Sequence, residues 1–216
     1  MVTTIAIYSP KGGSGKSTHT RLLSKVLKEN YGYDVLVIDT DPQGSLKDLS
    51  IMLEEDNDEN SLIAIPVEMV VENLHNKMYD ERGIVMLDIQ GVLYHNHNEK
   101  SSIMELLKTV DIIVMPIRPS SFDAFSAIKF KPFIESLNPD CTFVAFLNEF
   151  KKNNESLEIE ALLQNSGFKL LQKIKSSVHY PRLTISSYNA IDKKSKVREE
   201  YQVFTNQIIN LINEYK

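Results

Sequence analysis

Residues 5–18 read Ile5-Ala6-Ile7-Tyr8-Ser9-Pro10-Lys11-Gly12-Gly13-Ser14-Gly15-Lys16-Ser17-Thr18. An apolar run leads into a glycine-rich turn, and Lys-Ser-Thr then opens a segment with helical spacing, so the glycines lie where a strand passes into a helix. Glycines let successive backbone N–H groups curl around an anion, and a helix N-terminus adds unpaired donors and the positive end of its dipole. The stretch therefore predicts a phosphate-binding loop.

Two side chains of this loop extend the prediction to a nucleotide and a metal. Lys16 adds a full positive charge near the β- and γ-phosphates, and Ser17 offers a hydroxyl to Mg²⁺. The usual pattern G-x-x-x-x-G-K-[ST] requires glycine at position 10, where this chain has Pro10, followed by Lys11 and a pair of glycines. The loop is thus a variant of that pattern.

The string Lys-Gly-Gly-x-Gly-Lys-[Ser/Thr] resembles the deviant Walker A loop of the ParA/MinD group of ATPases. This resemblance implies that Lys11 reaches across a dimer to the partner's nucleotide, so that Lys11 and Lys16 both serve catalysis. The residues expected to bind ATP in the loop are Lys11, Gly12, Gly13, Ser14, Gly15, Lys16, Ser17 and Thr18.

Length and composition limit the class of protein. A chain of 216 residues with 42% hydrophobic residues is long enough for one well-buried domain, so we expect one domain over residues 1–216. No apolar run approaches the roughly 20 residues that span a bilayer, and the N-terminus has a strand pattern, so we expect a cytoplasmic protein. The single cysteine, Cys141, excludes an internal disulfide and the iron–sulfur members of the group. A net charge of −5 provides no global basic field, so any contact with nucleic acid must be local.

Strand-like and helix-like segments alternate along the chain. Leu22, Leu23, Val26 and Leu27 have helical spacing, and residues 35–38 form a continuous apolar run, as in a strand covered on both faces. Further strands are expected at residues 62–65, 83–88, 111–120, 142–147 and 170–174. The capping-box pattern Ser102-Ile103-Met104-Glu105 predicts a helix start. The alternation predicts an α/β phosphate-loop NTPase fold, with a mostly parallel twisted sheet and helices on both faces.

Two acids follow the second apolar run. Asp39 and Asp41 lie at the carboxyl end of the predicted strand, where α/β sheets bind ligands. Asp-Pro is also common in turns, and the dipeptide alone favours a turn. The longer string Val-Ile-Asp-Thr-Asp-Pro-Gln closely resembles the ParA signature at this place. The resemblance implies that Asp39 lies near the Mg²⁺ shell and that Asp41 orients or activates the attacking water.

A second strand ends in an acid in the form of a Walker B segment. Residues 83–88 read Gly-Ile-Val-Met-Leu-Asp, and in phosphate-loop enzymes this aspartate, here Asp88, holds Mg²⁺ through water or the loop serine. The expected metal site is therefore Ser17, Asp39 and Asp88. Most ParA-like chains continue with two prolines after the intervening residue, whereas this chain continues with Gln90 and Gly91. The departure leaves open how the following loop moves with nucleotide.

Two further stretches support the resemblance. Residues 113–120 read Ile-Val-Met-Pro-Ile-Arg-Pro-Ser, with Asp123 shortly after, and look like the small plasmid-borne ParA branch typified by ParF. Asn148 ends the strand at residues 142–147. In relatives an asparagine at this strand end contacts the adenine ring, so Asn148 is the candidate for the base, and a turn-forming asparagine is the alternative.

The C-terminal part carries a helix with an apolar face. A membrane-targeting tail would need a basic polar face, and after Arg198 the only cation is Lys216, so packing against the sheet is expected. Just before this helix lies a group of cations, Lys193, Lys194, Lys196 and Arg198. They are either a solvated helix start or a site for DNA phosphates, which a dimer would double.

The family resemblance implies a DNA segregation ATPase. ATP would close a homodimer that binds DNA nonspecifically and associates with the nucleoid, and a ParB-like centromere-binding protein would stimulate a hydrolysis that is slow without it. Two other classes stay open. One is a MinD-like membrane-cycling regulator, and the other is an ATP-dependent small-molecule enzyme similar to dethiobiotin synthetase, which would have no use for Lys11 in trans.

Overall fold

The computed structural model of the protein describes residues 2–41, 62–91, 97–180 and 195–215, the side chains of residues 97–101 excepted. Lys193 and Lys194, and the end of the Asp39 motif at Pro42 and Gln43, lie outside the described residues. The strands are β1 (Thr3–Ile7), β2 (Val35–Asp39), β3 (Leu62–Ala64), β4 (Ile84–Asp88), β5 (Ile112–Ile117) and β6 (Thr142–Leu147). The helices are α1 (Lys16–Tyr31), α3 (Val67–His75), α4 (His97–Lys108), α5 (Ser121–Leu137), α6 (Asn154–Asn165) and α8 (Lys196–Tyr215).

The named strands form one sheet in the order β3-β2-β4-β1-β5-β6, and every pairing between them is parallel. Asp88 at the end of β4 pairs in register with Asp39 of β2 on one side and with Ile7 of β1 on the other. The carboxyl ends of these three strands therefore meet at one edge, beside the start of the glycine-rich loop. The predicted α/β fold is confirmed.

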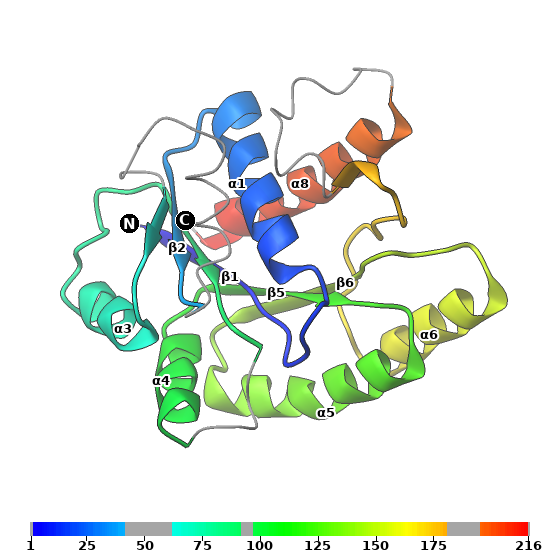
Figure 1. Ribbon diagram of the computed structural model, residues 1–216, viewed down its shortest axis with the longest axis horizontal. Coiled ribbons are helices and arrows are strands. Elements are labelled where there is room, and N and C mark those ends of the chain that lie inside the picture. Colours follow the sequence, from blue (N-terminus) through cyan, green and yellow to red (C-terminus); the bar gives the residue numbers. More distant parts are fainter. Residues whose placement is uncertain (1, 42–61, 92–96, 181–194, 216) are drawn as a thin grey trace.

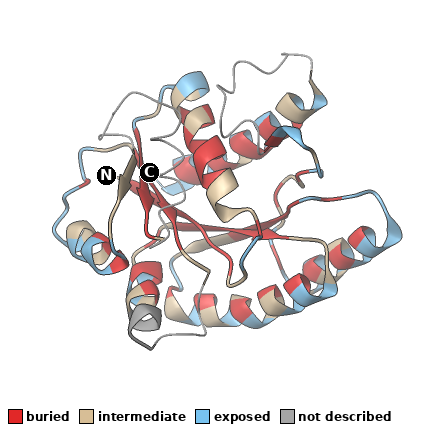
Figure 2. Cartoon of the chain, in the orientation of Figure 1, coloured by how far each residue is buried: buried red, intermediate tan, exposed pale blue. Residues whose placement is uncertain are grey.

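Helices cover both faces of the sheet. In Figure 1, α1 and α8 lie on one face, and α3, α4, α5 and α6 lie on the other. Alternate residues of β1 supply the two resulting cores: Ile5 and Ile7 belong to the cluster with α1 and α8, whereas Ala6 belongs to the other cluster. Figure 2 shows that the central strands are buried, as expected for parallel strands covered on both sides. Because both faces are covered, polar side chains can gather only at the ends of the central strands.

The crossover helix α1 is bounded by two glycines with left-handed backbone. Gly15 precedes its first residue with φ 100°, and Gly32 follows its last with φ 70°. The N–H of Gly32 reaches back to the carbonyls of Leu27 and Lys28, which is the usual way that glycine ends a helix. Leu22, Leu23, Val26 and Leu27 are buried, as their spacing predicted.

The expected strand at residues 170–174 is not a regular strand. Leu171 N–H donates to the Ala145 carbonyl at 2.8 Å, and the next such bond, from Ile174 to Leu147 at 2.8 Å, comes three residues later instead of two. The N–H of Gln172 donates instead to the Gln207 side chain of α8 at 2.7 Å. The segment runs beside β6 through two isolated bridges, because side chains of α8 take part of its hydrogen bonding.

Helices α4 and α8 test the predicted helix start at Ser102 and the predicted packing of the C-terminal helix. Helix α4 begins at His97, so the capping-box pattern at Ser102 lies inside it and the predicted start was wrong. The apolar face of α8 is buried, with Tyr201, Phe204 and Ile208 fully covered, which confirms that this helix packs on the sheet. Among the described helices, none is both long and apolar enough to cross a membrane.

Candidate functional site

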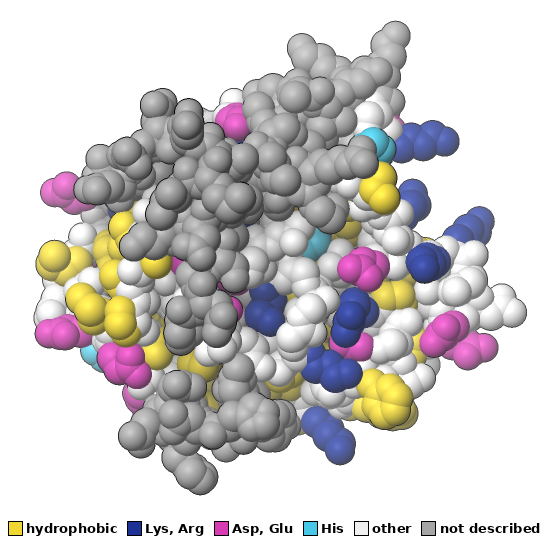
Figure 3. Space-filling view, in the orientation of Figure 1, with side chains coloured by type: hydrophobic (Ala, Val, Ile, Leu, Met, Phe, Trp, Pro, Cys, Tyr) yellow, Lys and Arg dark blue, Asp and Glu magenta, His cyan; other side chains and the backbone are white. Residues whose placement is uncertain are grey.

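A cavity of about 1190 Å³ opens where β1 passes into α1. Its walls come from the glycine-rich loop, the segments that follow β2 and β4, and α5 from Phe122 to Phe133. In Figure 3, several Lys and Arg side chains with acidic ones among them lie near the centre of the view, over this region. The predicted loop residues that line it are Lys11, Gly12, Gly13, Gly15, Lys16, Ser17 and Thr18, and Asp41, Asp88, Gln90 and Gly91 line it too.

The loop has the backbone that its glycines permit. Gly13 and Gly15 have φ values of 69° and 100°, in the left-handed region that L side chains rarely adopt. Gly15 stands at the N-terminus of α1, where four backbone N–H groups have no partner within the helix. These donors, together with the positive end of the helix dipole, make the loop suited to an anion such as phosphate.

Lys16 holds its ammonium inside the loop. Its Nζ donates to the Lys11 carbonyl at 2.9 Å. Burial lowers the pKa of Lys16, and the charges of Asp88 and Asp41 act in the opposite direction. The ammonium therefore lies between the loop backbone and the carboxylates, where it can meet the negative charge of a phosphate.

Two buried carboxylates lie at the ends of neighbouring strands of the sheet. Asp39 and Asp88 are 1% and 2% exposed. The ends of their strands are tied together by Thr40, whose N–H and hydroxyl donate to the Asp88 carbonyl at 3.0 Å and 2.9 Å. Burial raises the pKa of the Asp88 carboxyl to about 7, while a hydrogen bond from Ser17 and the charge of Lys16 lower it. The site thus holds a carboxyl group that is poised between its two protonation states.

The residues present fit a magnesium ion. Oδ1 of Asp88 has no hydrogen-bond partner among the described residues, although buried carboxylate oxygens are costly without one. The donor set of Ser17, Asp39 and Asp88 consists of hard oxygens, which Mg²⁺ prefers. The described part of the chain holds no cluster of three His, Cys, Asp or Glu that could hold a metal alone. Such a site suits Mg²⁺, which usually binds through a few protein oxygens plus phosphates and water.

Gly91 lies directly against the glycine-rich loop. A Cβ at this position would lie 2.8 Å from the Lys16 Nζ and 2.9 Å from the Ser9 carbonyl oxygen. The chain after β4 therefore presses directly against the glycine-rich loop, and only glycine fits without displacing the lysine or the backbone. Gly91 was seen in the sequence as an unexplained substitution, since this approach joins segments far apart in the chain.

Lys11 has a different environment from Lys16. Its Nζ lies 3.6 Å from the Asp123 carboxylate and 5.6 Å from the centre of the Phe122 ring, and the side chain is 37% exposed. Asp123 also lies 3.7 Å from Arg118 and is hydrogen-bonded to the Ser120 hydroxyl at the start of α5. Lys11 thus rests at the rim of the cavity, on the N-terminus of α5. Sequence reasoning noted Asp123 only through the resemblance and did not connect it with Lys11.

Asn148 forms a hydrogen bond to the backbone of the glycine-rich loop. Its Nδ2 donates to the Ser14 carbonyl at 2.8 Å, and its Oδ1 contacts Nε2 of His19 at 2.9 Å. Asn148 is buried and is not among the residues that line the cavity. Its contact with adenine therefore stays a prediction. His19 was missed in the sequence, where the only signal was a histidine on the apolar side of a helix, one turn after the loop.

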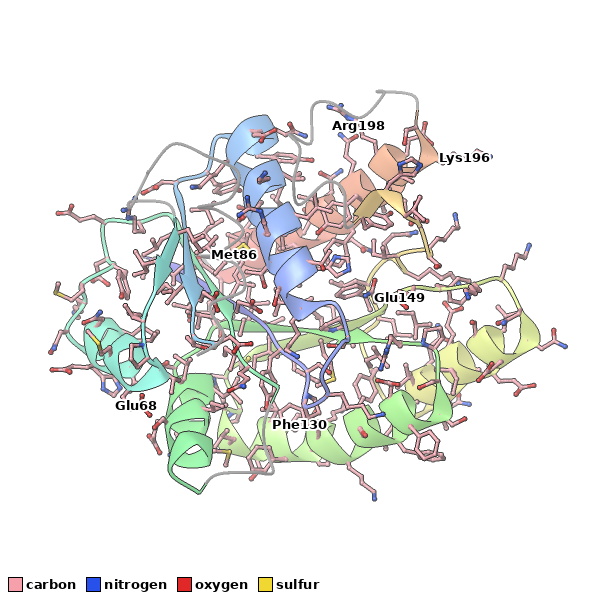
Figure 4. The ribbon with its side chains drawn as sticks, in the orientation of Figure 1. Glu68, Met86, Phe130, Glu149, Lys196 and Arg198 are labelled. Atoms are coloured by element: carbon pink, nitrogen blue, oxygen red, sulfur yellow. The ribbon has the colours of Figure 1, made fainter. Side chains whose placement is uncertain are left out.

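The predicted DNA-binding cations lie elsewhere on the molecule. Lys196 is exposed and Arg198 partly buried, in the first turn of α8. Figure 4 shows both at the N-terminal end of α8, on the opposite side of the sheet from Phe130 of α5.

Comparison with known proteins places this chain in a family. Residues 5–187 match the CbiA family, described as the CobQ/CobB/MinD/ParA nucleotide binding domain. The match covers most of the chain, so the chain belongs to this family, and it is a nucleotide-binding ATPase of the ParA/MinD type. A search of curated proteins found no sequence match.

Solved structures share the whole fold at low sequence identity. A plasmid partition protein from Borrelia burgdorferi bound to AMPPNP is 20% identical with a TM-score of 0.75, over 97% of this chain and 99% of that one. MinD from Aquifex aeolicus is 16% identical with a TM-score of 0.71, over 96% and 97%. Cobyrinic acid a,c-diamide synthase from Mycobacterium smegmatis, with bound ADP and magnesium, is 16% identical with a TM-score of 0.70, over 100% and 97%. These similarities establish the fold.

The contact at Gly91 predicts a sharp effect of one added methyl group. Gly91→Ala should weaken ADP binding about fivefold or more, because overpacking against the Ser9 carbonyl and the Lys16 Nζ costs about 1–3 kcal/mol. Isothermal titration with Mg²⁺ and ADP measures this. Gly12→Ala is the control, since an added Cβ there meets nothing within 4 Å, and it should weaken binding much less. Equal affinities of Gly91→Ala and the parent would contradict the proposed clash.

The raised pKa of Asp88 predicts a pH dependence of metal binding. With a pKa of about 7, the free carboxyl is partly protonated at neutral pH, and a cation must displace that proton. The affinity for Mg²⁺ and ADP should therefore rise with pH from about 6 to about 8, and binding should release a proton in that range. Isothermal titrations in two buffers of different ionisation enthalpy measure the number of protons released on binding. Asp88→Asn should remove this pH dependence, and the interpretation fails if the parent protein shows none.

Proposed function

We propose that this protein is a DNA segregation ATPase. ATP binding closes a homodimer, the dimer binds DNA nonspecifically, and a centromere-binding partner of the ParB kind accelerates hydrolysis and releases the DNA. The observation that carries the proposal is the separation of the two loop lysines. Lys16 occupies the cavity of its own subunit, whereas Lys11 lies at the rim, where a second subunit could receive it.

The chemistry of such a site is positioning and neutralisation of charge. Lys16 and the loop N–H groups hold the phosphates, and Asp41 positions water for in-line attack on the γ-phosphorus. Ser17, Asp39 and Asp88 would hold Mg²⁺, which supplies further neutralisation of the phosphate charge. Lys11 of each subunit completes the site of the other, so turnover is slow for a lone subunit.

Exposed aromatic side chains beside Lys11 support a dimer. Phe122 and Phe125 are 80% and 56% exposed and line the cavity together with Lys11. Large apolar side chains at such exposure are typical of interaction surfaces, in which aromatic residues are enriched. A dimer formed across the cavity would cover these rings and bring Lys11 to the partner's nucleotide.

Charge placement on α8 supports a contact with DNA. Lys196 and Arg198 lie in the first turn of this helix, where the positive end of the dipole disfavours cations. The helix dipole therefore gives no reason for cations at this place. A phosphate oxygen is attracted both by a helix N-terminus and by lysine and arginine side chains, so the backbone of DNA suits this place without reading its sequence.

Two rival functions make different predictions. A small-molecule enzyme, a class represented among the structural relatives by the diamide synthase, would need a metabolite for turnover and would not use Lys11 in trans. A MinD-like membrane regulator would need an apolar helix face for lipid, but the apolar face of α8, with Tyr201, Phe204 and Ile208, is in the core. The experiment that separates these functions measures the oligomeric state and DNA retention of one preparation with ATP, with ADP and without nucleotide. DNA retention that does not differ among the three conditions would contradict the proposal.

The DNA contact predicts an effect of charge reversal on α8. Lys196→Glu should weaken ATP-dependent DNA binding and make it less sensitive to salt, lowering the slope of log affinity against log salt by about 1 per lost phosphate contact. Fluorescence anisotropy over a series of salt concentrations measures the slope. Lys77→Glu, at an exposed lysine after α3, is the matched control. If both variants lose the same affinity, the effect is one of net charge and α8 is not the contact.

The resting contact of Lys11 predicts a variant with stronger dimerisation. Asp123→Asn removes the charge that holds Lys11 on its own subunit. A partly exposed ion pair is worth at most about 1 kcal/mol and each dimer contains two, so the ATP-dependent dimer should tighten by up to about thirtyfold. Sedimentation at several protein concentrations measures this, with Asp140→Asn as a control that removes the same charge at an exposed site. A weaker dimer for Asp123→Asn would indicate that Asp123 serves the interface itself.

A further inference from the structure

Four polar groups join α8 to the glycine-rich loop through the interior of the protein. The Tyr201 hydroxyl lies 3.3 Å from Nδ1 of His19, and Nε2 of His19 lies 2.9 Å from Oδ1 of Asn148. The Asn148 amide then donates to the Ser14 carbonyl at 2.8 Å. All of these side chains are buried, and they come from α8, α1 and the end of β6.

The chemistry of the groups fixes the direction of the hydrogen bonds. A carbonyl only accepts, so the nitrogen of the Asn148 amide faces Ser14 and its oxygen faces His19. His19 must therefore carry its proton on Nε2, which leaves Nδ1 to accept from the Tyr201 hydroxyl. Burial lowers the pKa of His19 to about 4, so the imidazole is neutral at physiological pH, as this arrangement requires. Every donor in the chain points toward the loop, and such bonds strengthen one another.

Packing leaves these groups little freedom. The His19 ring meets Phe146 edge-on with centroids 4.9 Å apart, and it stacks parallel to the Tyr201 ring at 5.9 Å. A Cβ at Gly15 would collide with Nδ2 of Asn148 and would lie 3.2 Å from Cδ2 of His19. The asparagine and the histidine thus press directly on the glycine at the start of α1.

We propose that Asn148 and His19 are positioning residues for the phosphate loop, and that Tyr201 anchors them to α8. In a planar trans peptide the carbonyl of one residue and the N–H of the next point in opposite directions. Holding the Ser14 carbonyl toward Asn148 therefore turns the Gly15 N–H the other way. Ser14 is buried and does not line the cavity, whereas Gly15 does. A free loop could turn this peptide and present a carbonyl oxygen to the phosphates, which would repel them.

This role differs from an adenine contact in what it predicts. A base contact would matter only for ligands that carry adenine, whereas a fixed loop matters for any ligand that carries phosphates. The inference rests on the proposed function only in that this loop binds phosphate. Magnesium pyrophosphate, which has no base, therefore separates the two roles.

The test measures the affinities for ADP by titration and for magnesium pyrophosphate by displacement of ADP. Asn148→Ala should weaken both ligands alike, about five- to tenfold, which is the usual effect of one lost hydrogen bond and an unpaired buried group. Loss of ADP affinity with pyrophosphate affinity unchanged would overturn the proposal in favour of a base contact. The proposal would also be overturned if the parent protein bound ADP but did not bind pyrophosphate. A parent protein that binds no nucleotide would instead overturn the proposed function.

Variants at His19 and Tyr201 separate positioning from simple packing. His19→Leu fills the same space with an apolar side chain that makes no hydrogen bonds. The variant should bind both ligands more weakly, as Asn148→Ala does. His19→Gln retains an N–H donor for Asn148 and should keep most of the affinity that His19→Leu loses. Tyr201→Phe removes only a hydroxyl, keeps the ring and should weaken both ligands about threefold. Thermal unfolding of each variant is measured in parallel. If the affinities of His19→Leu and His19→Gln do not differ, the hydrogen bond does not position the loop.

Discussion

Buried charge at one edge of the sheet is the constraint on which the rest of this structure depends. Two aspartates end neighbouring strands in register, and both are almost fully buried. Carboxylates removed from water are costly unless cations or hydrogen bonds compensate them. Lys16 supplies one cation from the adjacent loop, and its own burial lowers its pKa while the charges of Asp88 and Asp41 raise it. The two hydrophobic clusters on the faces of the sheet hold these opposing charges together.

The two lysines of one short loop show how the same residue type takes two roles. The Nζ of Lys16 is enclosed by its own loop, and Gly91 leaves just enough space for it. Lys11 is turned outward and rests on the charge of Asp123 beside exposed phenylalanines. A lysine held by a weak, partly exposed ion pair can be transferred to another anion at little cost. This difference supports the proposal that Lys16 acts in its own subunit and Lys11 acts in the partner subunit.

Much of the fold could be predicted from the sequence, because its signals are local. Apolar runs marked the strands, helical spacing and Gly32 marked α1, and the order of glycines and lysines marked the loop. The segment at residues 170–174 could not be predicted, since its hydrogen bonding depends on the Gln207 side chain more than 30 residues later. The links from Asn148 to Ser14 and from Lys11 to Asp123 are nonlocal in the same way. The roles of the site residues stay predictions, because those roles concern a bound nucleotide.

The central claim is that Lys11 acts on the nucleotide of the other subunit, and mixing two inactive variants tests it most directly. In a heterodimer of Lys11→Ala and Asp41→Ala subunits, one site has lost both groups, and the other keeps its own Asp41 and receives Lys11 from its partner. If the lysine acts in trans, an equal mixture should regain about a quarter of the parent ATPase rate, because half of the dimers are mixed and each has one complete site. A mixture that stays as inactive as its components would contradict the account.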